Sequence, residues 1–194
     1  MLSPEPQVTE ASLYRRLLGT EWDLLPLAIR CMHLSEDTLE AQGTVCIHHG
    51  KSLAARLISR MFGMPPASEA CPTTLAVCRE NSGERWTRHF GLHRLVSTQK
   101  VDATGLLIER FGPLLLRFRV TRDAGGLRYS QVGGALTIGK AVFNLPAVLV
   151  PIVEASESEA LGEGACNVRV RIAARFLGLI AFYEGTMRPL GDSR

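Results

Sequence analysis

Apolar and polar residues alternate along much of the chain, and the alternation is cleanest between residues 166 and 174. Side chains on a strand point to opposite faces in turn, so this pattern predicts a strand with one buried face and one wet face. The buried face is expected to hold Cys166, Val168, Val170, Ile172 and Ala174, with Asn167, Arg169, Arg171 and Arg175 on the other face and Ala173 as the exception.

Short strand-like segments recur at regular spacing after residue 72, separated by turn sequences such as Gly112-Pro113 and Gly125-Gly126. This spacing indicates hairpins of an antiparallel sheet rather than strand–helix–strand units. The expected strands are 38–47, 73–79, 84–90, 92–98, 105–110, 114–122, 127–132, 148–156, 166–174 and 179–187.

Helical spacing of apolar residues predicts two short helices near the N-terminus, over 12–18 and 26–33, and a third over 52–62. In the third helix, Leu53, Leu57, Ile58 and Met61 share one face, and Arg56 and Arg60 lie on the other. The fold class predicted is therefore mainly β (α+β): a curved antiparallel sheet or barrel of about 9–10 strands, with one helix inserted after the first strand. Residues 1–9 are expected to be a flexible terminus and 10–190 a single domain, whose inserted helix could act as a lid.

Composition narrows the class of protein. Apolar residues make up 46% of the 194 residues and charged residues 21%, as expected for a folded domain. The net charge of +3 comes without a nucleic-acid-binding motif, so nucleic acid is not an expected partner. The five cysteines form no C-x-x-C pair and the N-terminus has no signal-peptide pattern, which favours a cytoplasmic location.

The most apolar stretch, 135–153, is interrupted by a lysine, an asparagine and two prolines, so it makes a poor membrane span. We expect it to form buried strand and loop. Shallow contact with a membrane surface is the weaker alternative.

Gly50-Lys51-Ser52 lies between a strand and a helix, as in a phosphate-binding loop. Such a loop requires a glycine five residues before Gly50, where this chain has Val45. We therefore expect Gly50 to end the strand, Ser52 to cap the helix, and no nucleotide cofactor to bind here.

Other residue types that can carry chemistry lack the partners they need. His48 and His49 face opposite sides of a strand, and His89 and His93 lack further ligands, so no metal site is predicted. Cys46 and Cys78 lie in apolar strands, where a cysteine is usually part of the core.

The sequence GERWTRHFG, residues 83–91, supplies the most specific candidate site. In a strand, Trp86, Arg88 and Phe90 share one face. If that face lines a cavity, Arg88 is a buried cation between aromatic rings and suits the anionic end of an apolar ligand. If it faces outward, the three form an exposed ladder. Glu109 and Tyr183 complete the candidate ligand-binding set, although a structural ion pair is the favoured role for Glu109.

Several segments together resemble a bacterial family catalogued as domain of unknown function 4166. The matching segments span 13–185: LYRRLLG (13–19), Trp22, Leu25-Pro26, Arg30, His33, the helix after Gly50, GERWTRHFG (83–91), ERFGPL (109–114), Leu145-Pro146, Pro151 and LGLIAFYEG (177–185). The resemblance implies a bulky aromatic near Gly133-Gly134, which this chain lacks, so its pocket could be more open. It also implies occasional attachment to NAD(P)-dependent, saccharopine-dehydrogenase-like domains, but no established activity.

Two functions are therefore compared. The preferred hypothesis is a non-enzymatic binding or accessory domain that holds a small apolar or amphipathic anionic ligand, or docks on an oxidoreductase partner. The alternative is a cyclase or isomerase that uses general acid–base chemistry in the same cavity, with Glu109, Glu184, Tyr183 and His89 as candidate groups. The discriminator is whether an acid and a base converge on one point of a cavity.

Overall fold

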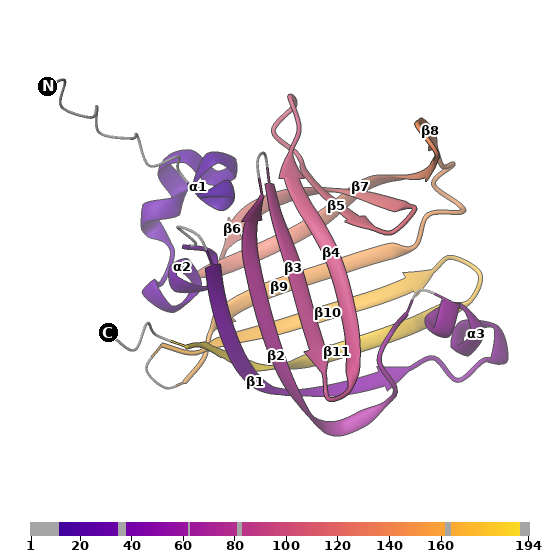
Figure 1. The fold of residues 1–194 in the computed structure, drawn as a ribbon, viewed down its shortest axis with the longest axis horizontal. Coiled ribbons are helices and arrows are strands. Elements are labelled where there is room, and N and C mark those ends of the chain that lie inside the picture. The colour runs from indigo at the N-terminus through magenta and orange to yellow at the C-terminus, as the bar shows by residue number, and fades with distance from the viewer. Residues whose placement is uncertain (1–11, 35–37, 62, 81–82, 162–163, 191–194) are drawn as a thin grey trace, which may run out of the picture.

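Ten of the described strands form a closed antiparallel barrel in the computed structural model, which describes residues 12–34, 38–61, 63–80, 83–161 and 164–190 (Figure 1). Neighbours around the ring follow the order β6-β5-β4-β3-β2-β1-β11-β10-β9-β7, and pairing of β6 with β7 closes it. The predicted fold class, an antiparallel sheet or barrel with short helices, is confirmed.

The strand bounds extend most of the expected segments by a few residues. The ring consists of β1 (Thr38–His49), β2 (Ser68–Glu80), β3 (Gly83–Phe90), β4 (His93–Val101), β5 (Leu107–Phe111), β6 (Leu114–Asp123), β7 (Gly126–Ile138), β9 (Ile152–Glu159), β10 (Cys166–Ala174) and β11 (Gly178–Pro189). The short strand β8 (Ala141–Asn144) was not predicted and pairs with the end of β7 outside the ring.

Two short helices close one end of the barrel, at the left in Figure 1. They are α1 (Leu13–Leu18) and α2 (Leu27–His33), joined by a 3-10 turn, η1 (Gly19–Leu24). Tyr14, Trp22 and Ile29 from these elements are buried in the barrel core. Among the described residues, no helix has the length and hydropathy needed to cross a bilayer.

The strand β10 has the predicted faces. Val168, Val170 and Ile172 point into the barrel, whereas Arg169 and Arg171 form ion pairs on the outside with Glu184 and Glu154. A β-bulge between Ile172 and Ala173 shifts the register and buries Ala173. The alternation therefore identified the core face correctly.

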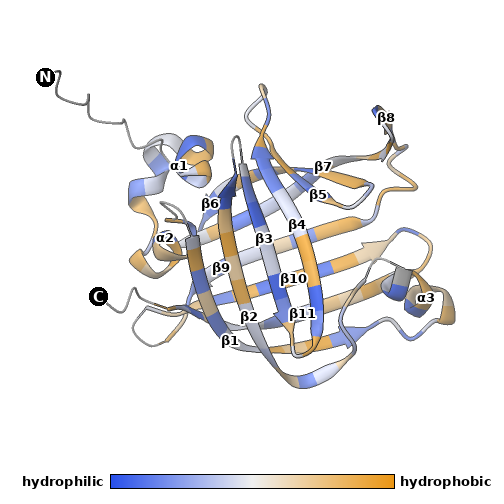
Figure 2. Cartoon of the chain, viewed as in Figure 1, coloured by the Kyte–Doolittle hydropathy of each residue, from blue (hydrophilic) through white to orange (hydrophobic). Residues whose placement is uncertain are grey.

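The helix α3 (Leu53–Met61) begins as predicted, because the Ser52 hydroxyl accepts a hydrogen bond from the Ala55 amide. Its orientation differs from that of a lid. The helix lies outside the barrel (Figure 2). It packs through Ala55 and Ser59, while Leu53 is 83% and Leu57 is 68% exposed. The described part of α3 contributes no side chain to the barrel cavity, so the lid expectation is wrong.

Close packing explains this orientation. A Cβ added to Gly50 would lie 1.9 Å from the Leu179 carbonyl oxygen and 2.9 Å from the Ala55 Cβ. The start of α3 therefore lies against β11 at a distance that only small side chains fit. Leucines cannot occupy that face, and they point to solvent instead.

The segment 135–153 was expected to be buried, and most of it is not. Only the first residues of β7 pair with β9, up to Ser130 opposite Glu154, so the end of β7 projects beyond that strand. β8 pairs with this projecting end and is exposed along its whole length. The large exposed apolar residues of the segment are Ile138, Val142, Phe143, Val148, Leu149 and Ile152.

Gly134 does not open the barrel interior. A Cβ on Gly134 would lie 2.7 Å from Val150 Cγ1, so the buried side chain of Val150 fills this space. Gly133 is open, because the nearest atom to such a Cβ is Arg117 Nη1 at 3.9 Å. The more open pocket suggested by these glycines is therefore not formed at Gly134.

The two cysteines expected in the core, Cys46 and Cys78, are not fully buried. Cys166 and Cys71 are buried, but Cys78 is exposed and Cys46 is half-buried. Cys78 lies opposite Thr38 and Arg85 on the outer face of the sheet, so the core assignment of Cys78 is wrong.

Candidate functional site

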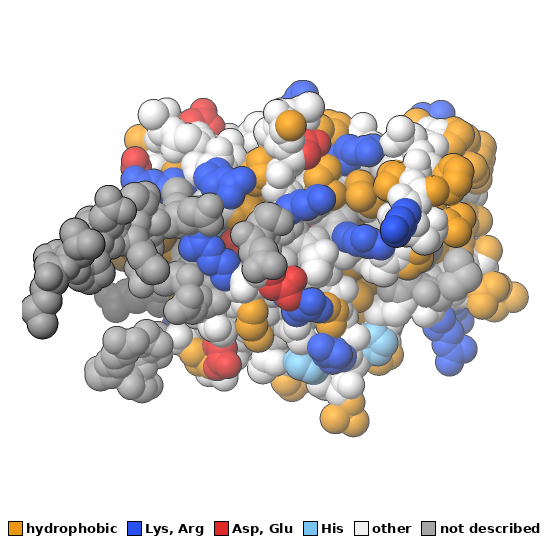
Figure 3. Space-filling view, turned by 45° about the horizontal axis from the view of Figure 1, so that its top comes forward, with side chains coloured by type: hydrophobic (Ala, Val, Ile, Leu, Met, Phe, Trp, Pro, Cys, Tyr) orange, Lys and Arg blue, Asp and Glu red, His pale blue; other side chains and the backbone are white. Residues whose placement is uncertain are grey.

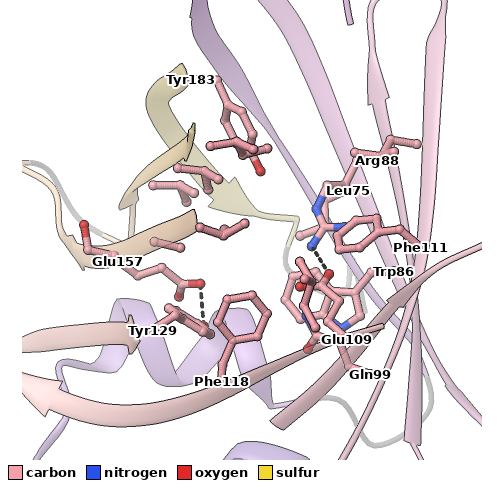
Figure 4. Close-up of a pocket in the computed structure, with 18 of the residues that line it drawn as sticks. Leu75, Trp86, Arg88, Gln99, Glu109, Phe111, Phe118, Tyr129, Glu157 and Tyr183 are labelled. Atoms are coloured by element: carbon pink, nitrogen blue, oxygen red, sulfur yellow. Dashed lines mark hydrogen bonds and ion pairs between the residues drawn. The ribbon is translucent and has the colours of Figure 1, made fainter. Parts of the chain in front are cut away.

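A cavity of about 160 Å³ lies inside the barrel (Figure 4). All ten strands of the ring contribute inward-facing side chains, most of them apolar. Tyr14, Met32 and His33 close the cavity at the end covered by α1 and α2, while Met64 and Pro151 border it towards the opposite end. A concave, mostly apolar space with a few polar groups is the usual form of a small-molecule site.

One polar cluster is built by Arg88, Ser97 and Glu109, which come from the adjacent strands β3, β4 and β5. Arg88 Nη1 donates to Ser97 Oγ at 2.9 Å, and Arg88 Nη2 donates to Glu109 Oε1 at 3.3 Å. The Ser97 hydroxyl donates to the same carboxylate oxygen at 2.7 Å. The protein itself therefore supplies the carboxylate that the buried guanidinium needs.

Arg88 keeps its charge in this setting. Burial is the largest single influence and works to lower the pKa of Arg88, but the charge and hydrogen bond of Glu109, together with Tyr183 and Tyr14, outweigh it, and the net pKa is raised. The guanidinium also lies 5.0 Å from the centre of the Trp86 ring, within range of a cation–π interaction. Trp86 in turn donates from Nε1 to the buried carboxylate of Glu84 at 3.0 Å, which fixes the indole.

A second polar cluster lies near α1 and α2. Tyr129, on β7, donates its hydroxyl proton to Glu157 Oε1 at 2.8 Å, and His33 Nε2 lies 2.7 Å from Glu157 Oε2. Tyr14 donates to Gln99 Oε1 at 2.9 Å, and its hydroxyl oxygen lies 3.3 Å from that of Tyr129. Figure 4 shows the bond between Tyr129 and Glu157 across the cavity from Arg88.

Burial and neighbouring charges shift the pKa values of the groups in this second cluster. Burial alone would raise the pKa of Glu157, but the charge of His33 and the hydrogen bonds from His33 and Tyr129 lower it below its ordinary value. Burial, with the nearby Glu157 charge, raises the pKa of Tyr14 and of Tyr129 well above the usual value. At neutral pH the cluster is therefore a Glu157 carboxylate held by the neutral phenol of Tyr129 and by the His33 ring, with the neutral phenol of Tyr14 beside it.

Two groups in the cavity retain unused hydrogen-bonding capacity. Tyr183 stacks edge-on against Phe90 with ring centres 5.5 Å apart, and its hydroxyl points into the cavity without a hydrogen bond to another described residue (Figure 4). His33 Nδ1 is buried and has no partner among the described residues. A buried polar atom without a partner is costly, and a ligand group can supply that partner.

The structure brings together all five residues proposed from the sequence as ligand-binding: Trp86, Arg88, Phe90, Glu109 and Tyr183 line the same cavity. Whether they bind a ligand is a separate question that stays a prediction. The structural ion pair expected for Glu109 exists, and its partner is Arg88 on β3.

Two of the groups proposed for acid–base chemistry are not in the cavity. Glu184 lies outside the barrel and pairs with Arg169. His89 belongs to the face of β3 opposite to Arg88 and does not line the cavity. The acid–base set of the alternative hypothesis is therefore wrong in these two members.

The second cluster was not proposed from the sequence as a site. Its missed residues are Tyr14, His33, Gln99, Tyr129 and Glu157. The alternation of residues along β9 could have identified Glu157, because it follows Val153 and Ala155 on the inward face. A carboxylate at an inward position indicates either a buried ion pair or a functional site.

No metal centre is indicated by the described residues. They contain no group of three or more histidine, cysteine, aspartate or glutamate side chains placed to hold an ion. His49 bonds to Ser59 and to the Pro65 carbonyl, and His93 bonds to the Gly63 carbonyl, so these rings have structural partners.

Comparison with known proteins adds a family but no activity. A family model described as "Domain of unknown function (DUF4166)" matches residues 25–187, which is most of the chain. No curated protein matches the sequence.

Proposed function

Because the chain belongs to the family of domains of unknown function 4166, which brings no activity with it, we propose a function from the cavity: the barrel binds a small, mostly apolar ligand with one polar, hydrogen-bond-accepting end. The apolar part would lie against the barrel walls. The polar end would lie between Arg88 and Tyr183.

The observation that carries this proposal is the mostly apolar cavity inside the barrel. An apolar cavity of about 150 Å³ is enough to hold a molecule the size of benzene, so about 160 Å³ suits a ligand built on a single ring or a short chain. Small β-barrels of similar strand number hold single small ligands in the same way. A longer ligand would have to extend past Met64 and Pro151.

The polar groups favour a neutral acceptor rather than an anion. Arg88 uses two of its five N–H donors in the hydrogen bonds to Ser97 and Glu109, and the Tyr183 hydroxyl is unpaired among the described residues. Both can therefore donate to a ligand oxygen. Glu109 already balances the charge of Arg88, and Glu157 adds a second carboxylate, so a hydroxyl or carbonyl fits better than the anionic head group first considered.

Trp86 provides a direct test of binding. In a Trp22→Phe background, Trp86 is the remaining tryptophan, and cyclohexanol should change its fluorescence saturably. Tyr183→Phe should weaken cyclohexanol binding by about 0.5–1.5 kcal/mol, the scale of one hydrogen bond between neutral groups. Fluorescence titration of both variants measures this difference.

Cyclohexane is the matched control probe, because it has the ring and lacks the hydroxyl. Its affinity should be unchanged by Tyr183→Phe, and hexanoate should bind more weakly than cyclohexanol. The proposal fails if none of these probes alters Trp86 fluorescence, or if Tyr183→Phe affects both rings equally.

A second candidate function, general acid–base catalysis, rests on a specific observation. Glu157 is a cavity carboxylate held between His33 and Tyr129, and the hydroxyl of Tyr14 lies beside that of Tyr129. An acid and a base within hydrogen-bond reach of one point are what an isomerase needs. The base would be Glu157 and the proton donor a neutral tyrosine.

Proton exchange distinguishes the two functions. If the cavity acts as a base, the protein should accelerate deuterium incorporation next to the carbonyl of cyclohexanone in heavy water, and Glu157→Gln should abolish that acceleration. Proton NMR follows the exchange. Binding of cyclohexanol without any acceleration supports the binding function alone. Docking on an oxidoreductase partner stays a prediction.

A further inference from the structure

We propose that the barrel end carrying α3 docks on the surface of an anionic lipid bilayer. The surface consists of exposed apolar and cationic side chains. The apolar rim is defined as Leu53, Leu57, Ile138, Val142, Phe143, Leu149 and Phe176, and the cations in the same segments are Lys51, Arg56, Arg60, Lys140 and Arg175. The inference goes beyond ligand binding and does not depend on what occupies the cavity. The sequence analysis favoured burial of residues 135–153 over contact with a membrane surface, and this proposal favours the contact.

Strand register places the three parts of the apolar rim at one end of the barrel. α3 follows the end of β1, where His49 pairs with Ala181 near the start of β11. The turn at 175–177 joins β10 to that start of β11. Ile152, at the start of β9, pairs with Ala173, so the segment after β8 reaches the same end. α3 and β8 lie at the right in Figure 1.

Each part presents large apolar side chains to solvent. Leu53 and Leu57 lie on the outward face of α3, Phe176 in the β10–β11 turn is 80% exposed, and Phe143 in β8 is 54% exposed. These side chains belong to three separate elements, and each of them remains exposed to solvent. Exposed apolar residues gathered at one place on a protein usually mark a contact surface.

The charges at the same three places have one sign. Segments 50–61, 136–153 and 174–179 hold Lys51, Arg56, Arg60, Lys140 and Arg175, all exposed, and no aspartate or glutamate. Glu69 at the start of β2 lies outside these segments, and Glu154, just beyond them, pairs with Arg171. In Figure 3, hydrophobic and cationic side chains gather at the right, where no acidic side chain is visible.

This combination fits an anionic bilayer better than a second copy of the chain. A two-fold dimer through the rim would place its five cations against the same five of the partner copy. A lipid surface instead offers anionic head groups to the cations and an acyl layer to projecting leucine and phenylalanine side chains. The geometry points to peripheral insertion of side chains, with the barrel remaining outside the bilayer.

Vesicle co-sedimentation tests the proposal with the full chain. The protein should bind vesicles of phosphatidylcholine mixed with phosphatidylglycerol, and bind phosphatidylcholine alone weakly. Leu53→Ser with Leu57→Ser should lower partitioning about tenfold or more, since both side chains lose their transfer into the interface. Lys140→Glu with Arg175→Glu should abolish the preference for anionic lipid.

Matched control pairs come from other parts of the surface. Leu24 at the end of η1 and Leu27 at the start of α2 are 63% and 64% exposed, and the variant with both changed to serine should bind vesicles as the wild type does. Arg119→Glu with Arg122→Glu on β6 is the control for charge. Circular dichroism confirms that all four variants are folded.

Three results would overturn the proposal. The first is no binding to anionic vesicles. The second is an equal loss of binding for the control pairs. The third is a wild-type dimer in analytical ultracentrifugation that becomes monomeric in the Leu53→Ser, Leu57→Ser variant, which would make the rim a subunit interface.

Discussion

Arg88→Met is expected to lower the free energy of unfolding by about 3–5 kcal/mol, because it leaves the Glu109 carboxylate buried without its counter-charge. The guanidinium and carboxylate side chains are only 16% and 12% exposed, so water cannot replace the lost partner easily. Methionine keeps an unbranched apolar side chain in place of the aliphatic part of arginine and carries no charge, which limits the loss of packing. Urea denaturation followed by circular dichroism measures the difference.

The same strand offers a matched control. Arg85, three residues earlier on β3, pairs with Glu80 on the outside of the barrel, where both side chains are nearly half exposed. Arg85→Met should therefore cost less than about 1 kcal/mol. Adding Glu109→Leu to Arg88→Met should restore part of the stability, since no unpaired charge remains. Equal losses for Arg88→Met and Arg85→Met would show that Arg88 is solvated rather than buried.

The barrel was predictable because its signal is local. Along β10 the apolar and charged residues alternate at the period of a strand, and turn residues such as Gly112-Pro113 separate the hairpins. Both features act within a few residues of one another, so a single sequence displays them. β8 escaped prediction because it is four residues long and has no buried face.

The orientation of α3 could not be predicted from its pattern. The spacing of Leu53 and Leu57 shows that the helix has an apolar face, but not whether the protein covers that face. The deciding contact is between Gly50 and the backbone at Leu179, which is 129 residues away in the sequence. The local sequence pattern contains no information about a contact between residues so far apart in the chain.

The two polar clusters differ in how far the sequence could reveal them. Alternate residues of a strand share one face, so the sequence alone places Trp86, Arg88 and Phe90 together, and the structure places that face inside the barrel. Glu157 and His33 are 124 residues apart, on β9 and α2, so only the tertiary fold joins them. A sequence can show that a polar residue occupies an inward position, but it does not identify the partner on another element.

Glu157→Ala is expected to lower the free energy of unfolding by roughly 2–6 kcal/mol, since the His33 and Tyr129 donors each lose a buried partner worth roughly 1–3 kcal/mol. Those bonds also hold α2 against the barrel wall, so the substitution loosens the end that closes the cavity. Glu154→Ala is the matched control: it lies on the same strand, its side chain is 65% exposed, and its pair with Arg171 should contribute less than about 1 kcal/mol.

Glu157 should also make stability depend on pH in a direction fixed by its pKa. The pKa of Glu157 is lowered in the folded state, so its contribution is fully present above the ordinary glutamate pKa of about 4.3 and is lost as pH falls through the folded pKa. Glu157→Gln keeps the size of the side chain and removes this titration. Urea denaturation at a series of pH values should give a shallower acid loss for Glu157→Gln than for the wild type. Parallel curves would mean that Glu157 is not held as a carboxylate by His33 and Tyr129.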